Sequence, residues 1–359
     1  MNIEVVDLFC GVGGLTCGLN QSGLQVKAGF DVDETCRYPY EHNNNAKFVC
    51  KDIKKVTADD INRFYSKKAI KVLAGCAPCQ PFSQMSCKYH KNGRDDDSRY
   101  NLLLEFGRLV KDIQPDIVSM ENVPIIKKTN VFEEFLNILM SNGYHVDYKT
   151  VYCPDYGIPQ NRRRFLLLAA KNQDIKLLNA THNKSNYVTV RDAISDLPPI
   201  KSGEICTRDV LHQTAKLSEL NLKRIKHSKP GGTWKDWPKD LRCECHKRET
   251  GRTYTSVYGR MCWDAVSPTI TTQFYCYGTG RYGHPEQDRA LTLREGALLQ
   301  TFPREYEFLE PGKELVLKNI AREIGNAVPV KLGEMIGESI KTFQKIKEKN
   351  EWRTKENTI

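Results

Sequence analysis

Short apolar runs alternate with amphipathic stretches through the first half of the 359-residue chain. Apolar runs bounded by turn residues predict strands, and apolar residues at helical spacing predict helices. The predicted strands are residues 3–9, 27–30, 72–75, 116–120, 146–152 and 165–170. The predicted helices are residues 15–22, 102–113 and 131–140. Such alternation is typical of a mostly parallel sheet covered by helices, so we expect an α/β fold.

The pattern changes after about Lys171. From there to about Arg252 the sequence is polar, basic and rich in Pro and Gly, which predicts a smaller, loop-rich domain. Apolar spacing returns at residues 293–299 and at 328–346, where it predicts a helix. We therefore expect a first domain over 1–175, a second over 176–300, a C-terminal segment over 301–346 that returns to the first, and a charged tail over 347–359.

Charge is distributed unevenly. The formal net charge is +10, and Lys216 to Arg252 holds 11 Lys and Arg against 5 Asp and Glu, which is 11 − 5 = +6. Such a segment suits a polyanionic partner, but a solvated surface explains it equally well.

The apolar runs, the N-terminus and the cysteines indicate the cellular compartment of the protein. No apolar run reaches the roughly 18 residues that span a bilayer, and residues 1–9 lack the layout of a signal peptide. We expect a soluble, cytoplasmic chain without membrane contact. Its 13 cysteines then predict free thiols in a reducing compartment rather than a disulfide framework.

A glycine-rich turn follows the first predicted strand. The segment from Asp7 to Gly14 reads DLFCGVGG and leads into a helix. Glycines at such a turn let the backbone approach a ligand closely, and Asp31, at the end of the second strand, can hold ribose hydroxyls. Asp52 is placed to accept a hydrogen bond from an adenine amino group. The pattern favours a nucleoside cofactor over a structural turn with surface carboxylates, without excluding the latter.

Two cysteines follow a later strand, within the sequence GCAPCQPFS from Gly75. Their spacing also fits a redox pair or half of a zinc site. A redox pair should open a helix, whereas Pro81 and a polar loop follow here. Zinc needs further ligands, and the cluster Cys243-Glu244-Cys245-His246 lacks the usual two-residue gap, so we expect no metal. Cys76 is interpreted as a small structural residue near the strand end.

Other polar residues are predicted at the same sheet edge. Glu121 ends the next strand, and a carboxyl group beside a thiol nucleophile suits addition to an electron-poor ring. Arg162, Arg163 and Arg164 precede a further strand, where alternation would put Arg162 and Arg164 on one face. A surface acid and surface arginines are the plainer alternatives for each residue taken singly.

Taken together, the chain resembles the DNA (cytosine-5) methyltransferase family. Seven ordered blocks carry the resemblance: DLFCGVGG from Asp7, GCAPCQPFS from Gly75, DSR from Asp97, MENV from Met120, QNRRRF from Gln160, REGALLQTFP from Arg294 and GNAVPV from Gly325. The resemblance implies a Rossmann-like S-adenosylmethionine-dependent sheet with a loop-rich target-recognition domain. Methyl transfer to carbon-5 of a cytosine flipped out of a specific DNA duplex is the implied reaction.

The resemblance also assigns roles. Cys79 would attack carbon-6, with Glu121 bonding the ring N3 and exocyclic amine, Arg164 holding the cytosine O2 and Arg162 nearby. The implied cofactor residues are Phe9, Gly11, Gly13, Asp31, Asp52, Leu102 and Asn326. The implied DNA contacts are Gln80, Ser83, Arg94 and Thr269, with residues 84–99 as a closing loop.

The resemblance leaves related activities open. A compact enzyme of this kind resembles the modification half of a restriction-modification system, with a separate endonuclease as a candidate partner, a monomeric state and association with the nucleoid. Cytosine-5 methylation of transfer RNA is the alternative, but that branch carries a Cys-Phe-Thr tripeptide, which this chain lacks.

Overall fold

The computed structural model describes residues 2–78 and 101–356, and it divides the chain into two compact units. Unit 1 comprises Met1–Tyr152, Arg163–Ala180 and Val328–Ile359, and unit 2 comprises Cys153–Arg162 and Thr181–Ala327. The cysteines within the described ranges are free thiols. No helix within these ranges is long and apolar enough to cross a bilayer.

Unit 1 is built on a seven-stranded sheet in the order β3-β2-β1-β4-β5-β7-β6. The strands are β1 (Ile3–Leu8), β2 (Gln25–Asp31), β3 (Lys47–Cys50), β4 (Ile70–Gly75), β5 (Ile117–Asn122), β6 (Tyr144–Tyr152) and β7 (Arg163–Lys171). The first five pair in parallel, and β7 runs antiparallel to both β5 and β6. The predicted α/β class is confirmed, and each of the six predicted strands is present; β3 is an additional strand.

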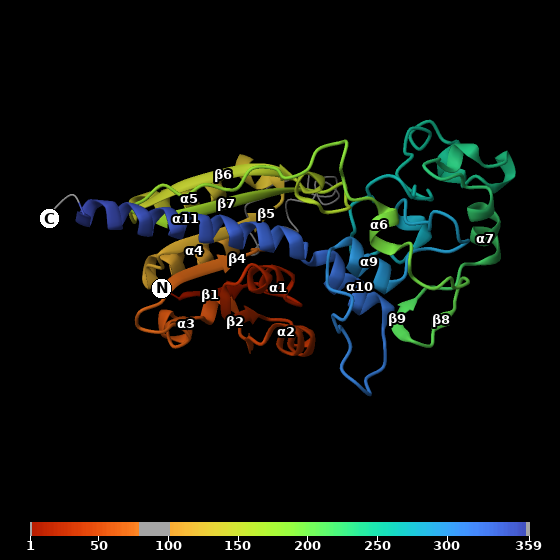
Figure 1. The fold of residues 1–359 in the computed structure, drawn as a ribbon. Coiled ribbons are helices and arrows are strands. Elements are labelled where there is room, and N and C mark those ends of the chain that lie inside the picture. Colours follow the sequence, from red (N-terminus) through yellow and green to blue (C-terminus); the bar gives the residue numbers. More distant parts are fainter. Residues whose placement is uncertain (1, 79–100, 357–359) are drawn as a thin grey trace. The chain divides into compact units, whose positions relative to one another are not determined.

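Helices cover both faces of this sheet. Its helices are α1 (Gly14–Gln21), α2 (Arg37–Asn44), α3 (Ala58–Asn62), α4 (Leu102–Ile113), α5 (Asn130–Ser141) and α11 (Val330–Glu356). Phe106 of α4 and Phe135 of α5 are fully buried in one core cluster that also contains alternate residues of the central strands. The opposite face carries α1 and α11, which run beside each other in Figure 1. The helices expected at 15–22, 102–113 and 131–140 are therefore confirmed.

Close backbone packing fixes α11 on α1. A Cβ atom added at Gly18 would lie 2.0 Å from the carbonyl oxygen of Val330, and one at Gly333 would lie 2.7 Å from that of Leu15. Only glycine permits this approach. The helix expected at 328–346 is confirmed, although it begins at Val330 and continues to Glu356 through the charged tail.

Unit 2 contains little regular structure. Its elements are α6 (Val190–Ile194), β8 (Ile205–Cys206), β9 (Asp209–Gln213), α7 (Glu219–Lys226), α8 (Glu244–Lys247), α9 (Leu293–Leu299) and α10 (Leu317–Asn326). A small apolar cluster around the buried Trp234, Trp237 and Tyr277 forms one part of its interior. The buried ion pair between Arg289 and Glu295, with 2.6 Å between Nη2 and Oε1, lies in another.

Candidate active site

The carboxyl ends of β1, β2, β4 and β5 meet at one edge of the sheet in unit 1. Leu8 pairs with Gly75, and Gly75 pairs with Met120, the residue before Glu121. Loops that follow parallel strands therefore converge here, which is where open α/β sheets bind ligands. The glycine turn, Asp31, the start of the Cys79 loop and Glu121 all lie at this edge.

The glycine turn is held open by left-handed backbone. Phe9, Gly11 and Gly13 have φ angles of 58°, 50° and 87°, and they turn the chain from β1 into α1 within five residues. A Cβ atom added at Gly11 would meet nothing within 4 Å. The turn therefore has open space beside its backbone, as a nucleoside cofactor requires.

Asp31 is oriented by backbone donors. Its Oδ2 accepts from the Gly11 amide at 2.8 Å, and its Oδ1 accepts from the amides of Val32 at 2.7 Å and Asp33 at 3.0 Å. A carboxylate has about four acceptor positions, so it can bind a ribose hydroxyl while it keeps these three bonds. Val32 follows it with 66 % of its surface exposed. Val32 was not among the predicted cofactor residues, although an apolar residue directly after an acid at a strand end is a signal in the sequence.

Arg108 connects the two other elements that carry predicted cofactor residues. Asp52 caps the 3-10 turn Ile53–Lys55 by accepting from the Lys54 amide, and Leu102 is the first residue of α4. From α4, the Arg108 guanidinium donates to the carbonyl oxygens of Ile53 at 3.1 Å and Val56 at 3.0 Å. The Asp52 turn is thereby fixed against α4.

Asp7 is a buried acid that the sequence did not single out. Its side chain is 1 % exposed, and Oδ2 accepts from the Thr16 hydroxyl at 2.7 Å. Oδ1 has no hydrogen-bond partner among the described residues. Burial raises the pKa of Asp7 to about 7, although the bond from Thr16 opposes the shift and the charge of Asp31 adds to it. An orphaned acceptor beneath the glycine turn fits a site that awaits a ligand or a water molecule.

The corner between the ends of β4, β5 and β7, called here the candidate catalytic corner, contains a buried ion pair. Glu121, 7 % exposed on β5, lies with Oε1 at 2.8 Å from the Nε of Arg164 on the adjacent strand β7. On the β4 side, Asn122 donates to the carbonyl oxygen of Ala77 at 3.2 Å. The start of the loop that leads to Cys79 is thus tied to the strand that carries Glu121.

Cys76 lies in the same corner. Its thiol is hydrogen-bonded to Glu121, and burial together with the charges of Glu121 and Asp7 raises the pKa of Cys76 well above that of a free cysteine. A thiol that stays protonated at neutral pH is a poor nucleophile. This environment fits the structural role expected for Cys76 better than a redox role.

Several predicted residues fall outside the described ranges. They are Cys79, Gln80, Ser83, Arg94 and the expected closing loop over 84–99.

Arg162 differs from the expectation that it shares a strand face with Arg164. The strand β7 begins one residue later, and Arg162 belongs to unit 2. It is 4 % exposed, and its guanidinium donates to the carbonyl oxygens of Ile270 at 3.0 Å and Ala327 at 3.4 Å. Alternation could not reveal this, because the chain leaves the sheet at Tyr152 and re-enters it only at Arg163.

Gln160 joins distant segments of unit 2. Its Nε2 donates to the Leu299 carbonyl at 3.1 Å and to Oε1 of Gln300 at 2.9 Å, and its Oε1 accepts from the Ile270 amide at 2.9 Å. Gln300 in turn donates to the Ile324 carbonyl at 2.7 Å. One buried polar network therefore joins the QNRRRF and REGALLQTFP blocks to Ile270 and to the end of α10.

Thr269 and Asn326 occupy different surroundings in unit 2. The Thr269 hydroxyl donates to the Asn161 carbonyl oxygen at 2.5 Å, and Thr269 is half-buried. Asn326 is exposed at the end of α10. The preceding Gly325 packs on Thr271, since an added Cβ would lie 2.4 Å from the Thr271 carbonyl carbon.

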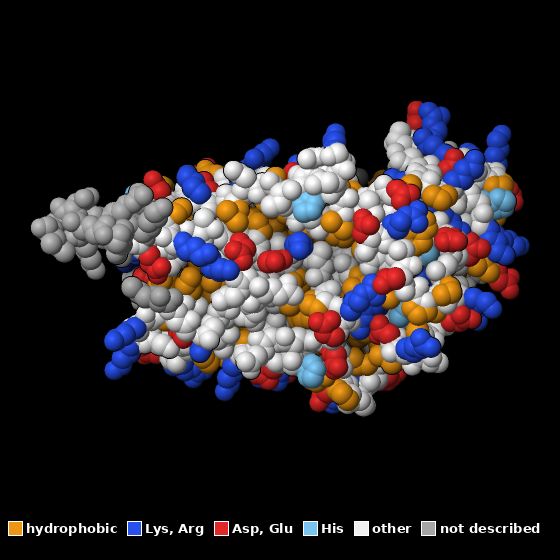
Figure 2. All heavy atoms as spheres, in the orientation of Figure 1, with side chains coloured by type: hydrophobic (Ala, Val, Ile, Leu, Met, Phe, Trp, Pro, Cys, Tyr) orange, Lys and Arg blue, Asp and Glu red, His pale blue; other side chains and the backbone are white. Residues whose placement is uncertain are grey.

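The basic segment between Lys216 and Arg252 lies in unit 2. Nine of its eleven Lys and Arg residues are exposed, whereas Arg224 is buried and Arg242 is half-buried. On the face drawn in Figure 2, blue side chains gather at the end of unit 2 that carries α7. A phosphate backbone could reach most of these charges.

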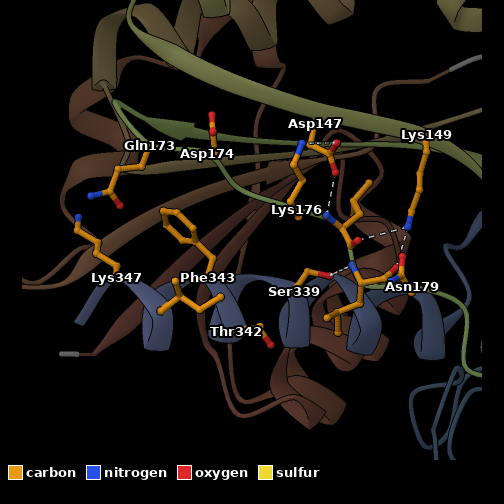
Figure 3. A pocket seen from close by; sticks show the side chains of 13 residues that line it. Asp147, Lys149, Gln173, Asp174, Lys176, Asn179, Ser339, Thr342, Phe343 and Lys347 are labelled. Carbon is orange, nitrogen blue, oxygen red and sulfur yellow. Dashed lines mark hydrogen bonds and ion pairs between the residues drawn. The ribbon is translucent and has the colours of Figure 1, made fainter. Parts of the chain in front are cut away.

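A cleft of about 1100 Å³ lies elsewhere in unit 1, between β6, residues 173–179 and α11. Figure 3 shows Lys149 and Asp147 bonded to its wall. Lys149 donates to the Leu178 carbonyl at 2.7 Å, and the Leu178 amide donates to the Ser339 hydroxyl at 3.1 Å. These bonds fix the segment after β7 to α11, and none of the predicted catalytic or cofactor residues that the structure describes lines the cleft.

Comparisons with known proteins agree on one family. The model of C-5 cytosine-specific DNA methylase matches residues 3–342. The chain is 53 % identical over 342 residues to the type II methylase M.HgiDII of Herpetosiphon aurantiacus, covering 94 % of this chain and 95 % of that protein. It is 31 % identical to the type II methyltransferase M1.BsuMI of Bacillus subtilis, covering 93 % and 79 %.

Solved structures show the same fold. A crystal structure described as a prophage-encoded DNA modification methyltransferase of E. coli superposes with a TM-score of 0.67 at 24 % identity, covering 95 % of this chain and 99 % of that one. The Dnmt2 methyltransferase of S. pombe superposes with a TM-score of 0.60 at 19 % identity, covering 95 % and 99 %.

Proposed function

The chain belongs to the C-5 cytosine-specific DNA methylase family, and we propose that it methylates one cytosine within a specific double-stranded sequence through a covalent adduct of Cys79. The observation that carries this proposal is the buried Glu121–Arg164 pair at 2.8 Å, at the sheet edge where the loop toward Cys79 leaves β4. An acid and a fixed cation beside a nucleophile are what addition to a pyrimidine ring needs.

The family uses S-adenosylmethionine, which when bound supplies a methyl group activated by its sulfonium. We propose that the open glycine turn holds it, with Phe9, Gly11 and Gly13 against the methionine and ribose parts. Asp31 would bind the ribose hydroxyls, and the exposed Val32 would pack on the adenine. Support comes from the open space beside Gly11 and from the three backbone donors that orient Asp31.

The remaining predicted cofactor residues complete the proposal. Asp52 would accept from the adenine amino group, with Leu102 packed beside it and Asn326 closing the site from the C-terminal segment. Arg108 supports the first two roles because it fixes the Asp52 turn to α4. No metal ion enters the transfer in this scheme.

The residues of the catalytic corner would act in sequence. The Cys79 thiolate adds to carbon-6 of the cytosine while Glu121 hydrogen-bonds N3 and the exocyclic amine. Arg164 holds Glu121 and the cytosine O2, so negative charge that develops on the ring is neutralised. Carbon-5, made nucleophilic by the addition, takes the methyl group; loss of its proton to a base then reforms the double bond and expels the Cys79 thiolate.

Arg162 acts differently in this proposal. Its guanidinium is held by the carbonyl oxygens of Ile270 and Ala327, so it would position the recognition segments rather than touch the base.

DNA contacts are proposed for both units. Gln80, Ser83 and Arg94 would contact the DNA around the extruded base, and residues 84–99 would close over it. Thr269 would bind a phosphate, and the exposed basic residues of 216–252 would neutralise the duplex backbone. On this proposal, residues 176–300 act as the target-recognition domain.

A role in restriction-modification is supported by the names of the two relatives described above, both type II enzymes. We propose that the chain acts as a monomer in the cytoplasm, associated with the nucleoid, and that a separate endonuclease cleaves the same sequence when it is unmethylated.

Bisulfite sequencing of DNA from cells that express the chain tests the proposal. The expected result is 5-methylcytosine at one position of one short sequence, and its absence in cells that express Cys79→Ser. Methyl transfer to transfer RNA but not to duplex DNA, measured in parallel with labelled S-adenosylmethionine, would support the alternative substrate instead.

A further inference from the structure

Three side chains of metal-binding type converge on α8 in unit 2. The ligand atoms of Cys243, Cys245 and His246 all lie within 4.8 Å of one another. Cys243 occupies the N-cap position without a side-chain capping bond, and the other two lie in the single turn of the helix. The sequence argued against a metal here, because the two cysteines are not separated by two residues. The short helical turn nevertheless brings positions 243, 245 and 246 together.

The separations suit one ion after a small adjustment. Zinc lies about 2.3 Å from a thiolate sulfur in tetrahedral sites, so two such sulfurs are about 3.8 Å apart. The two sulfurs lie within 4.8 Å of each other here, which exceeds this value by at most about 1 Å. Cys245 is exposed and Cys243 is half-buried, so both side chains can rotate inward.

His246 supplies an independent indication of a ligand. It is 5 % exposed, and its Nδ1 has no hydrogen-bond partner among the described residues. A buried polar atom without a partner destabilises the folded state. A metal ion bound at Nδ1 would give this atom the partner that it lacks.

The surroundings fix the imidazole and one thiol. The His246 ring stacks on Trp234 at 4.2 Å between centroids and 14° between planes. Trp234 is itself held by a bond from its Nε1 to the Tyr254 carbonyl at 2.7 Å. The Tyr258 hydroxyl is hydrogen-bonded to the Cys243 sulfur. Partners of this kind orient first-shell ligands in metal sites.

The backbone around the cluster is tightly packed. A Cβ atom added at Gly251 would lie 1.8 Å from the carbonyl oxygen of Cys245, so the loop after α8 folds directly onto the ligand turn. Few regular elements stabilise this region, since α8 has only four residues. A metal ion bound here would link α8 to the apolar residues packed around Trp234.

We propose that Cys243, Cys245 and His246 bind a zinc ion that stabilises this part of unit 2. Thiolate and imidazole ligands select zinc over magnesium or calcium, which prefer oxygen ligands. The fourth tetrahedral position would be taken by water. The site takes no part in methyl transfer, so this inference does not depend on the proposed reaction.

Cobalt binding tests the proposal directly. Full-length protein without an affinity tag is reduced, stripped with a chelator and titrated anaerobically with Co²⁺. One Co²⁺ per chain is expected, with a thiolate-to-cobalt charge-transfer band that Zn²⁺ abolishes. Cys243→Ser combined with Cys245→Ser should lose the band, and His246→Asn should weaken binding. Cys262→Ser, in the same unit but outside the cluster, should keep both stoichiometry and band.

Three results would contradict a metal site. Absence of the band in the reduced wild-type protein, or an unchanged band in the double variant, would overturn the site. So would a disulfide between Cys243 and Cys245 that forms in place of metal binding, detected as two missing thiols. Should the double variant not fold, Cys245→Ser alone decides, because its exposed side chain supports no packing. Zinc should also raise the melting temperature of the wild type and of Cys262→Ser, but not of the double variant.

Discussion

The carboxylate of Glu121 on β5 is ion-paired with the guanidinium of Arg164 on β7, with 2.8 Å between Oε1 and Nε. The two residues are 43 positions apart, calculated as 164 − 121, and only the antiparallel pairing of β5 with β7 brings them together. The pairing matches Glu121 with Leu166, two residues beyond Arg164, so the long arginine side chain reaches diagonally across the strands. Both side chains are mostly buried, so solvent screens the pair weakly.

Replacing Arg164 should impair catalysis more than folding. Arg164→Gln removes the cation that orients Glu121, and we expect kcat/KM for methyl transfer to fall about 100-fold. Arg163→Gln is the matched control, because that guanidinium lies over the Tyr152 ring at 4.8 Å instead. Steady-state kinetics with labelled methyl donor measure both. Equal activity in the two variants would remove Arg164 from the catalytic corner.

Stability measurements separate the charge pair from the chemistry. Arg164→Gln leaves Glu121 buried without its partner, which should lower the free energy of unfolding by roughly 1–3 kcal/mol. Adding Glu121→Gln should restore much of that stability while activity stays low. If the double variant is less stable than Arg164→Gln, the two residues are not acting as a charge pair.

Asp31 should control cofactor affinity. Asp31→Asn weakens the acceptor proposed for the ribose hydroxyls, and calorimetry should find S-adenosylmethionine bound about tenfold more weakly, equivalent to about 1.4 kcal/mol. Asp59→Asn, at an exposed acid in the first turn of α3, is the control and should not alter binding. Unchanged affinity in Asp31→Asn would leave the residue with only its bonds to the backbone.

The sequence predicted the sheet because most of its strands contain a short run of apolar residues, such as residues 165–170. It missed β3, where Lys47 and Cys50 flank only two apolar residues. It also missed α2, whose eight residues include Arg37, Glu41 and two asparagines, so its buried face depends on Pro39 and Tyr40. In both cases tertiary packing stabilises an element that the local sequence pattern does not predict.

The candidate site was only partly predictable for a related reason. Asp31 and Glu121 end predicted strands, so the rule that parallel strands present their carboxyl ends at one edge was enough to place them together. The orphaned oxygen of Asp7 and the commitment of Arg162 to distant carbonyls depend on long-range contacts. No local pattern encodes such contacts.

The buried Asp7 should make stability fall as pH rises from 5 to 8. Its pKa is raised from 3.8 to about 7 in the folded protein, so the folded state binds more protons than the unfolded state across this window. Stability then decreases with pH, by roughly 2–3 kcal/mol for this group alone. The effect should level off above the folded pKa.

Asp7→Asn tests this dependence, because it removes the titration while it keeps the shape of the side chain. Urea unfolding at pH 5 and pH 8 should show the variant gaining stability relative to wild type at the higher pH. Asp59→Asn, at an exposed position, should show no such gain. Parallel pH profiles for wild type and Asp7→Asn would show that the buried acid is ionised throughout.

Gln160 should be critical for the integrity of unit 2. Gln160→Ala removes bonds to Leu299, Gln300 and Ile270 at once and leaves their buried polar groups unsatisfied. We expect a loss of about 2–4 kcal/mol and faster proteolysis within Thr181–Ala327. Gln213→Ala is the control, because its amide donates only to the nearby Val210 carbonyl. Similar melting curves for the two variants would contradict a central role for the network.

The last prediction distinguishes one nucleophile from a thiol pair. Cys79→Ser should abolish methyl transfer but leave duplex binding intact, because the hydroxyl is a far weaker nucleophile than a thiolate. Cys76→Ala should remain active, since burial and the neighbouring acids keep that thiol protonated. DNA with 5-fluorocytosine at the target should trap wild type and Cys76→Ala as denaturation-resistant complexes, because fluorine stands in place of the carbon-5 proton whose loss would release the thiol. Equal loss of trapping in both variants would instead indicate that the two cysteines act as a pair.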